Sequence, residues 1–259
     1  VALGLFCPPF CDDMTIAKQA LKIANGGYKD DIEDLVKIFY RKNIEESFKD
    51  LDEVDKAKVI TKLDTNKYDI KSNEKLILNI NEYTLSNYEF NLEENSYLEI
   101  NKFYKNNGNN EEVTINLNGI NSKVIYNFSV LSNKSEKYKI NVNHNNKNTI
   151  SIINNHGVVL NGSKLSFIVN SNVYKGNTKS VLEQSSKIII MGENNSEIYP
   201  NLYIDEFDAS AHHAASIGKF NKDEIFYLLT KGIDYESAVN LLIKGFLENN
   251  LNGGDKFEC

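Results

Sequence analysis

The spacing of apolar residues along the chain changes character near residue 64. Before that point, apolar residues recur three or four positions apart, as they do on one face of a helix. The two clearest examples are Ile16–Ala24 and Ile32–Phe39. A third stretch, Glu45–Leu63, alternates charged and apolar residues and is also predicted to be helical, with a break. We therefore expect a helical N-terminal region over residues 1–63.

Beyond residue 64 the helical pattern gives way to short runs rich in β-branched and aromatic residues, which are typical of strands. About eleven runs are predicted to be strands: Lys75–Ile80, Thr84–Phe90, Tyr97–Phe103, Val113–Leu117, Lys123–Val130, Tyr138–Val142, Thr149–Ile153, Lys164–Val169, Ser180–Leu182, Lys187–Met191 and Glu197–Ile204. They follow one another roughly every 8–15 residues with almost no helix between them, which fits a sandwich, a barrel or a β-solenoid. This region, residues 64–205, is expected to be the core of the protein.

The predicted turns in this region are rich in asparagine. Asparagine runs occur at Asn106–Asn110, Asn143–Asn148, Asn154–Asn155 and Asn194–Asn195. Asparagine tolerates the left-handed backbone conformation that the corners of a coiled parallel solenoid require. The turns therefore support a solenoid, although strand spacing alone leaves the sandwich and the solenoid open.

The last part of the chain, residues 206–259, is predicted to contain two short helices. Asn221 and Asp234 are suitable N-caps, and Lys231 followed by Gly232 is a suitable end for the first helix. Apolar residues of the second helix recur at helical intervals and define one face, made of Ala238, Leu241, Leu242, Gly245 and Phe246. Such a helix pair is marginal by itself in water, so we expect part of this face to pack on the strand region.

Charge and composition exclude several classes of function. The chain has a net charge of −7, a pI near 5.3 and no basic patch, which argues against nucleic acid or an anionic membrane as a partner. No apolar run approaches the length of a membrane span, and the first residues lack the basic flank of a signal peptide. Cys7, Cys11 and Cys259 lie at the extremes of the chain and do not form a disulfide framework. A reducing, cytoplasmic location is therefore expected, with Cys7 and Cys11 as a weak candidate metal pair.

No common catalytic motif is present. The sequence lacks a phosphate-binding Gly-rich loop, an H-E-x-x-H pair and a G-x-S-x-G turn. The acidic pairs Glu93–Glu94 and Glu111–Glu112 are predicted to lie in solvated loops. His144 and His156 are predicted to be turn residues because asparagine surrounds them. We expect a protein that is not an enzyme; the enzyme or binding alternative is a β-solenoid that cleaves or binds carbohydrate.

The C-terminal sequence resembles a known family. The run HHAASIGKFNKDEIFYLLTKGIDYESAVNLLIKGFL, His212 to Leu247, resembles the C-terminal signature of the SufB/SufD proteins, which are scaffold subunits of the Suf iron–sulfur cluster assembly system. The segment KGNTKSVLEQSSKIII, within Gly157–Ile204, resembles the family's sequence more loosely. The resemblance implies a right-handed parallel β-helix between short helical regions, which agrees with the order of helices and strands predicted above.

The resemblance also implies partners. A family member docks a SufC-type ABC ATPase on its C-terminal helices, and it pairs through the end of its β-helix with a SufB-like subunit or a second copy of itself. The candidate docking residues are Phe226, Tyr227, Lys231, Gly232, Gly245 and Phe246. A transient iron–sulfur cluster at the subunit interface would be the only cofactor.

One of the two adjacent histidines matches the family histidine. Neighbouring residues on a strand point to opposite faces, so only one of His212 and His213 can join a given site. The resemblance selects His213, as an interface residue or a metal or cluster ligand. Ala214 replaces the SufB-type glutamate, and Ser185 replaces the SufB-type cysteine. These departures make the chain similar to SufD or to a divergent, single-type SufB/SufD protein.

Overall fold

The computed structural model describes residues 57–105, 108–160 and 162–251. Residues from Ala57 onward belong to one compact unit. The predicted helices before residue 57, the Cys7–Cys11 pair and Cys259 lie outside the described residues.

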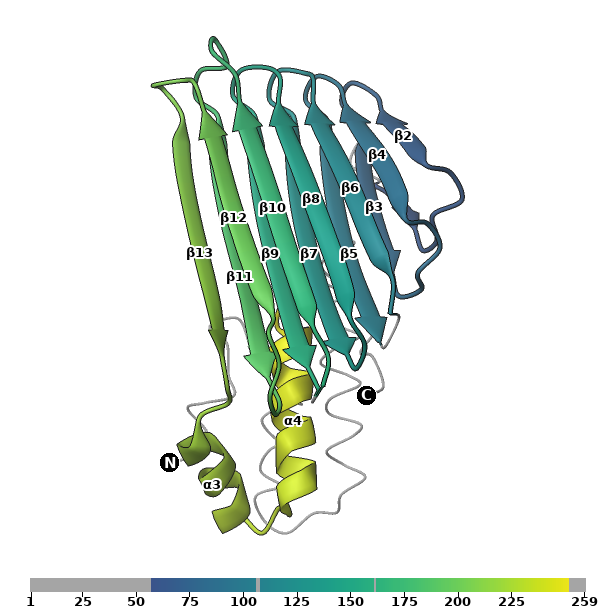
Figure 1. The fold of residues 1–259 in the computed structure, drawn as a ribbon. Helices are drawn as coiled ribbons and strands as arrows, with labels where there is room; N and C mark the ends of the chain where they lie inside the picture. Colours follow the sequence, from purple (N-terminus) through teal and green to yellow (C-terminus); the bar gives the residue numbers. More distant parts are fainter. Residues whose placement is uncertain (1–56, 106–107, 161, 252–259) are drawn as a thin grey trace, which may run out of the picture. The chain divides into compact units, whose positions relative to one another are not determined.

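The described chain winds into a parallel β-solenoid with two sheets (Figure 1). Successive strands alternate between the sheets, and each strand pairs in parallel with the strand two places later. Sheet A has seven strands: β1 (Lys58–Ile60), β3 (Lys75–Ile80), β5 (Tyr97–Lys105), β7 (Lys123–Ser132), β9 (Ile150–Val159), β11 (Val181–Ile190) and β13 (Ser210–Gly218). Sheet B has six strands: β2 (Lys67–Ile70), β4 (Asn87–Leu92), β6 (Asn110–Leu117), β8 (Glu136–His144), β10 (Leu165–Val173) and β12 (Glu197–Ile204). This architecture confirms the predicted parallel β-helix and rules out an antiparallel sandwich.

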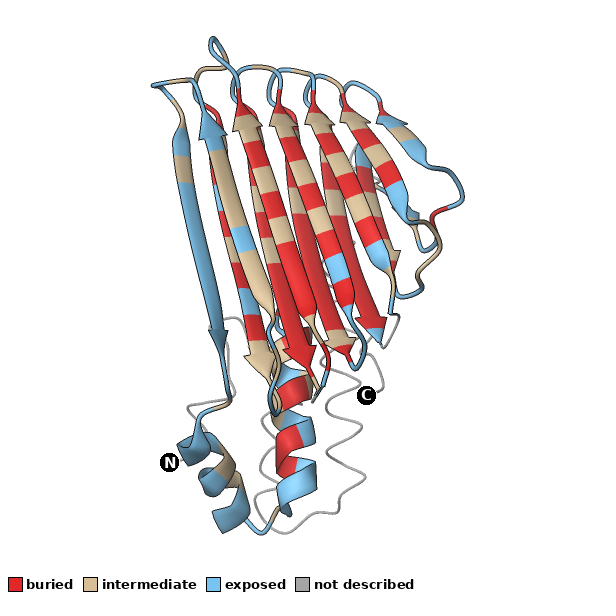
Figure 2. Cartoon of the chain, viewed as in Figure 1, coloured by how far each residue is buried: buried red, intermediate tan, exposed pale blue. Residues whose placement is uncertain are grey.

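The core fills the space between the two sheets. Buried and less buried residues alternate along the middle strands, as Figure 2 shows, because alternate side chains of a strand point to opposite faces. Aromatic rings occupy the widest part of the interior: Tyr104, Phe128, Tyr138 and Phe167 contact one another edge to face or tilted. Burying such rings is the main source of stability for a solenoid of this kind.

One corner of successive coils has the same left-handed backbone conformation. Asn73, Asn95, Asn121 and Asn148 have φ between 54° and 64°, and Lys179 takes the same position one coil later with φ of 60°. In four of these coils the next residue is a serine or threonine whose hydroxyl donates to the carbonyl three residues earlier: Ser96, Ser122, Thr149 and Ser180. The predicted left-handed asparagine is confirmed at Asn148, in one of the predicted asparagine runs, and single asparagines outside those runs take the same conformation because it costs asparagine little.

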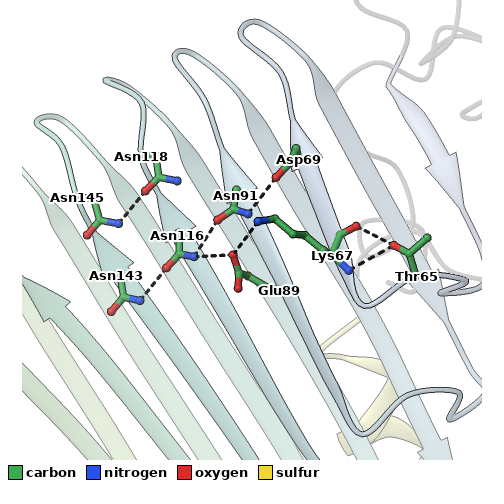
Figure 3. Close-up of polar contacts among 9 residues, drawn as sticks. All are labelled: Thr65, Lys67, Asp69, Glu89, Asn91, Asn116, Asn118, Asn143 and Asn145. Carbon is green, nitrogen blue, oxygen red and sulfur yellow. Dashed lines mark hydrogen bonds and ion pairs between the residues drawn. The ribbon is translucent and has the colours of Figure 1, made fainter.

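Asparagine side chains also form ladders on the outer faces of both sheets. On sheet B, Asn143 donates to Asn116, Asn116 to Asn91, and Asn91 to Asp69, as seen in Figure 3. On sheet A, a second ladder comprises Asn79, Asn101, Asn127 and Asn154. Each ladder adds side-chain hydrogen bonds parallel to those of the backbone. The asparagine content therefore serves the strands as well as the turns.

Several predicted boundaries are wrong in detail. Asn154 and Asn155 lie inside β9 and not in a turn, because their side chains bond to neighbouring coils. The two runs predicted at Ser180–Leu182 and Lys187–Met191 form the single strand β11, since polar residues between them also alternate. The helix predicted up to Leu63 is contradicted at its end by β1. The short strands β1 and β2 are absent from the predicted strands, whereas the strand predicted around His212 and His213 is present as β13.

Two helices follow β13, as predicted. Helix α3 (Lys222–Thr230) begins at the N-cap Asn221, which accepts from the backbone N–H of Asp223, and Gly232 follows its C-cap Lys231 with φ of 83°. Helix α4 (Tyr235–Glu248) begins at the N-cap Asp234, which accepts from the backbone N–H of Ser237. Both predicted N-caps and the left-handed glycine are confirmed.

The apolar face predicted for α4 is only partly the one that packs. Val239, Ile243 and Leu247 are buried and cluster with Phe103 and Val158 of sheet A. Leu241 is exposed instead. Apolar residues surround most of this helix, so two overlapping stripes fit the helical period equally well, and the sheet selects the one that it can cover.

Candidate functional site

The solenoid ends at an uncovered edge. Strand β13 pairs only with β11, and β12 pairs only with β10, so both final strands lack a partner on one side among the described residues. Figure 2 shows that β13 is exposed along nearly its whole length. An unpaired edge of this kind presents free backbone donors and acceptors, and it is a template for pairing with another chain.

The register of β13 separates the two adjacent histidines. His213 is in register with Gln184 of β11, which is buried on the interior side, whereas His212 is in register with exposed Glu183. His212 also lies near the Ser210 hydroxyl on its own side of the strand, at 3.4 Å. His213 therefore faces the end of the solenoid interior, and His212 faces the outer surface. The predicted separation of the two side chains is confirmed.

The side chains near His213 are polar, but few of them are metal ligands. Gln184 donates to the Ser171 hydroxyl at 2.8 Å and to the Asn201 carbonyl at 3.3 Å. Its Oε1 is buried and accepts no hydrogen bond from the described residues. The described part of the chain contains no group of three histidine, cysteine or acidic side chains placed to hold a metal ion. His213 could supply one ligand to a cluster, and the other ligands would have to come from outside the described residues.

The second candidate surface is the helix pair, where large side chains are exposed. No residue of α3 is buried. Phe226 is 66% exposed and Tyr227 is 59% exposed, which means that neither ring belongs to the intramolecular core. The Lys231 ammonium lies 5.1 Å from the centre of the Tyr227 ring, a distance at which a cation and an aromatic face attract. Exposed aromatics and a cation at one helix end are typical of a binding surface.

A groove of about 480 Å³ lies between α4 and the segment that leads into α3. Its wall includes Phe220, Leu241, Leu242, Gly245 and Phe246. Gly245 contributes no side chain to the groove, and an added Cβ there would meet no atom within 4 Å. Of the six predicted docking residues, the structure thus places Gly245 and Phe246 in the groove, and the other four on α3 or the turn after it.

Helix α4 is fixed to sheet A at its C-terminal end. The Ser129 hydroxyl donates to the Leu247 carbonyl at 2.8 Å, and His156 Nδ1 lies 2.9 Å from the Phe246 carbonyl. The Phe246 ring stacks on His156 with 4.4 Å between ring centres. Carbonyls in the last turn of a helix have no donor within the helix, so these side chains from the sheet act as its cap.

The predicted turn roles of His144 and His156 are wrong, because both side chains are buried on strands. His144 ends β8 and lies between the Thr149 and Ser151 hydroxyls, at 2.7 and 2.9 Å. Burial lowers the pKa of His144 to about 3. Burial also lowers the pKa of His156, although its hydrogen bond to the Phe246 carbonyl acts in the opposite direction. Both histidines are structural, and the alternation of apolar and polar residues in β8 and β9 was the signal for this.

The acidic pairs have different roles. Glu93 is half-buried and pairs with Lys71, whose side-chain hydrogen bond lowers the pKa of the Glu93 carboxyl. Glu111, in contrast, is buried inside the solenoid and pairs with Lys102. The prediction of a solvated loop is therefore wrong for Glu111. The signal that could have revealed it is the alternation from Glu111 through Val113 and Ile115, which puts all three side chains on one face of β6.

Among the described residues, no helix is both long enough and apolar enough to cross a membrane.

The part of the chain that matches a known protein family includes most of the solenoid and most of the helix pair. Residues 70–246 match the SUF system FeS cluster assembly, SufBD core domain. The chain is 32% identical over 120 residues to the iron–sulfur cluster assembly protein SufD of Bacillus subtilis, over 46% of this chain and 28% of that protein. It is 42% identical over 52 residues to a SufBD family protein of Pyrococcus horikoshii, over 20% of this chain and 12% of that protein. It is 30% identical over 117 residues to a SufBD family protein of Synechocystis, over 42% of this chain and 23% of that protein.

The chain thus matches less than a third of the length of each of these relatives. The match to the core domain nevertheless extends over most of the chain and includes both candidate surfaces, the β13 edge and the helix pair. The parallel solenoid followed by two capped helices is the architecture that the sequence resemblance implied. This protein belongs to the SufB/SufD family of iron–sulfur cluster assembly proteins.

Proposed function

We propose that the protein is a scaffold subunit, without catalytic activity of its own, of a Suf-type iron–sulfur cluster assembly complex. The observation that carries this proposal is the match of the SufBD core domain to residues 70–246, which contain both an unpaired solenoid edge and an exposed helix pair. Neither surface has an intramolecular purpose that explains its exposure. Each is available to a different protein partner.

The helix pair is the proposed docking surface for a SufC-like ABC ATPase. Phe226 and Tyr227 are exposed, and Lys231 places a charge beside the Tyr227 ring. The groove with Gly245 and Phe246 in its wall offers a recess at the start of α3, where Glu224 also lines it. Aromatic anchors beside a recess commonly dominate the free energy of association, with losses of about 2 kcal/mol or more on truncation. The ATPase would bind and hydrolyse ATP, and this chain would only hold the ATPase in place within the complex.

This docking assignment is tested by comparing two tyrosines of similar exposure. Tyr227→Ala removes the exposed ring on α3, and Tyr174→Ala removes a ring that is 51% exposed at the end of β10. Each variant is co-expressed with a SufC-like ATPase, and the dissociation constant is measured by calorimetry. We expect Tyr227→Ala to weaken binding at least tenfold and Tyr174→Ala to leave it unchanged. Equal affinities for both variants and the unaltered protein would contradict the docking assignment.

The β13 edge is the proposed pairing surface for a SufB-like subunit or for a second copy of this chain. His213 faces the end of the interior, in register with Gln184. It would therefore meet a partner that continues the solenoid. A transient cluster at this interface would be the cargo of the complex, with His213 as one ligand and the remaining ligands on the partner, since the described residues contain no group of three histidine, cysteine or acidic side chains that could hold a metal ion.

His212→Ala is the matched control for the proposed role of His213, because it removes the same side chain from the opposite face of the same strand. We expect His213→Ala to weaken subunit pairing or to lower cluster yield in a reconstituted assembly, and His212→Ala to change neither. Pairing is measured by analytical ultracentrifugation, and cluster yield by absorbance. Identical behaviour of the two variants would remove His213 from the site. Purification of the chain as a monomer that binds glycans and no ATPase would favour the carbohydrate-binding alternative.

A further inference from the structure

A buried ion pair lies inside the solenoid, away from both candidate surfaces. Lys102 of β5 and Glu111 of β6 form this pair, and their side chains are 0% and 2% exposed. Lys102 Nζ directly contacts Glu111 Oε1. The pair joins the two sheets, because β5 belongs to sheet A and β6 to sheet B. An amine and a carboxyl group are thus held in contact at a place from which the chain excludes solvent.

Two tyrosine hydroxyls complete the polar contacts of the Glu111 carboxyl group. Tyr88 donates to Oε1 at 2.7 Å, and Tyr104 donates to Oε2 at 2.8 Å. The Tyr88 hydroxyl also accepts from the Lys102 ammonium at 2.8 Å. Tyr88 therefore lies between the nitrogen and Oε1, where it can take a proton from one and give a proton to the other. Tyr104 lies where it can stabilise negative charge on Oε2.

Aromatic rings surround the nitrogen of Lys102. It lies 4.5 Å from the centre of the Phe128 ring and 5.1 Å from that of Tyr126. Burial lowers the pKa of Lys102, and the Glu111 carboxylate opposes this effect. Removing two charges from water costs several kcal/mol for each ion. A form of the pair without charge would avoid that cost.

An amide bond between the two side chains is such an uncharged form. Reacting groups that are held in contact have effective concentrations far above those of free molecules, which favours condensation. Water is the product of the condensation and also the reagent that reverses it, so the exclusion of water from this interior favours the amide and protects it. The site thus brings together both reacting groups, a proton relay and a dry environment.

We propose that Lys102 and Glu111 condense to an intramolecular isopeptide bond, which ties β5 to β6 across the interior. First, a proton passes from the ammonium through the Tyr88 hydroxyl to Oε1, which leaves a neutral amine and a neutral carboxylic acid. The carboxyl group turns about its Cγ–Cδ bond to face the amine. The Nζ lone pair then forms a bond to Cδ, while the π electrons of the C=O bond move to Oε2, where Tyr104 donates its hydrogen bond.

The intermediate then loses water. A second proton passes from Nζ through Tyr88 to Oε1, the C=O bond re-forms from the electron pair on Oε2, and the Cδ–Oε1 bond breaks. One water molecule leaves, and the nitrogen keeps one hydrogen as an amide N–H. The reaction is a dehydration without change of oxidation state, so it consumes no oxidant, reductant or other reagent.

The first test uses the full chain without substitutions, so it does not depend on the folding of a variant. The purified protein is denatured, and its intact mass is measured by electrospray mass spectrometry. We expect a mass that is lower than the encoded mass by one water molecule. Trypsin should then leave the chain uncleaved after Lys102 and release a branched peptide that joins Lys102 to Glu111. An intact mass equal to the encoded mass, unchanged after long incubation of the folded protein, would overturn the proposal.

Substitutions identify the two reacting groups. Lys102→Met removes the amine and should abolish the loss of mass. Glu111→Gln keeps an acyl group but changes the leaving group, so the loss should become that of one ammonia molecule, located by the same branched peptide. The control is Lys71→Met, which removes an ion pair with Glu93 whose side chains are 61% and 43% exposed, and it should lose one water as the unaltered chain does. A loss of water that persists in Lys102→Met would overturn the proposal.

Tyr88→Phe tests the proton relay, because it keeps the ring and removes only the hydroxyl. The unaltered chain and the variant are refolded from the denatured protein of inclusion bodies, and the fraction of branched peptide is followed with time. We expect the bond to form about tenfold or more slowly in Tyr88→Phe, since a positioned acid–base group commonly contributes at least that much. Equal rates in the two proteins would overturn the assignment of Tyr88 as the relay.

Discussion

The interior of the solenoid and the C-terminal helix pair have opposite relations to solvent. The interior is filled by rows of side chains that the chain itself covers, with the rings of Phe90, Tyr126 and Phe128 fully buried. Helix α3 has no buried residue, and its Phe226 and Tyr227 are exposed. This difference means that the core of the solenoid is packed without α3. Substitutions inside should therefore act on stability, and those on α3 should act on association.

Helix α4 lies between these two extremes. Val239, Ile243 and Leu247 pack on sheet A, while the opposite side of the helix borders the groove. The Ser129 and His156 side chains hold its last turn in place. A partner bound to the helices would therefore be attached to the solenoid mainly through α4.

The largest effect on stability is expected from removing an interior ring. Phe128→Ala deletes a side chain that contacts Tyr138 at 4.6 Å and Tyr104 at 5.5 Å between ring centres. We expect it to lower the free energy of unfolding by about 3–5 kcal/mol, because the rigid sheets cannot close the cavity. Phe226→Ala makes the same change at an exposed site and should cost less than about 0.5 kcal/mol. Urea denaturation monitored by circular dichroism measures both, and equal losses would contradict the distinction.

A change of pH tests the interior in a second way, through His144. Its pKa is lowered to about 3 in the folded protein, against about 6.5 in an unfolded chain. As pH falls from about 6.5 towards 3, the unfolded chain binds a proton that the folded protein does not, so stability decreases by about 1 kcal/mol per pH unit. Above about pH 6.5 this contribution is constant.

His144→Gln is the control, because glutamine does not titrate but can still bond with the Thr149 and Ser151 hydroxyls. We expect the variant to be less stable than the unaltered protein at pH 7, and the difference to shrink as the solution is acidified. Urea midpoints at a series of pH values measure this. Parallel pH profiles for the two proteins would show that His144 does not contribute.

Much of the solenoid could be predicted because its signals are local. Strand β12 and strand β3 have the predicted boundaries, since β-branched and aromatic residues fill them and turn residues flank them. The caps Asn221 and Asp234 were also predictable, because an N-cap depends on its own side chain and the next few residues. The opposite orientations of His212 and His213 could be predicted because strand alternation is a local property.

The features that were missed depend on contacts distant in sequence. Glu111 follows an asparagine run and looks like a loop residue, yet Tyr88, Lys102 and Tyr104 make its burial possible. Ser129 is 118 residues away from Leu247, the residue whose carbonyl it caps. Which apolar stripe of α4 packs on the sheet depends on such contacts, and no pattern within the helix reveals them.

The asparagine ladders on the outer faces of the sheets should contribute less to stability than the interior rings. Asn127 is buried and both donates to Asn101 and accepts from Asn154, each at 3.0 Å. Asn127→Ala should cost about 2 kcal/mol, because it leaves a buried donor and a buried acceptor unsatisfied. Asn172 ends its ladder on sheet B and makes one such bond, to Asn143. Asn172→Ala should cost less than about 1 kcal/mol, and a larger loss than for Asn127→Ala would contradict a ladder role.

At Gly245 the expected change in stability is small, and stability and association should respond with opposite signs. Gly245 lies inside α4 on the groove side, and a Cβ added there would meet no atom of this chain within 4 Å. Gly245→Ala should therefore stabilise the helix by about 0.5–1 kcal/mol, since alanine loses less backbone entropy than glycine. The same methyl group narrows the groove from the side that a partner would approach. Hydrogen exchange of α4 should slow while the SufC-like ATPase binds more weakly, and the control Asn240→Ala, on an exposed position of α4 outside the groove, should leave ATPase binding unchanged. If Gly245→Ala slows exchange and binds the ATPase with full affinity, the groove is not part of the docking surface, and the exposed rings of α3 must account for binding without it.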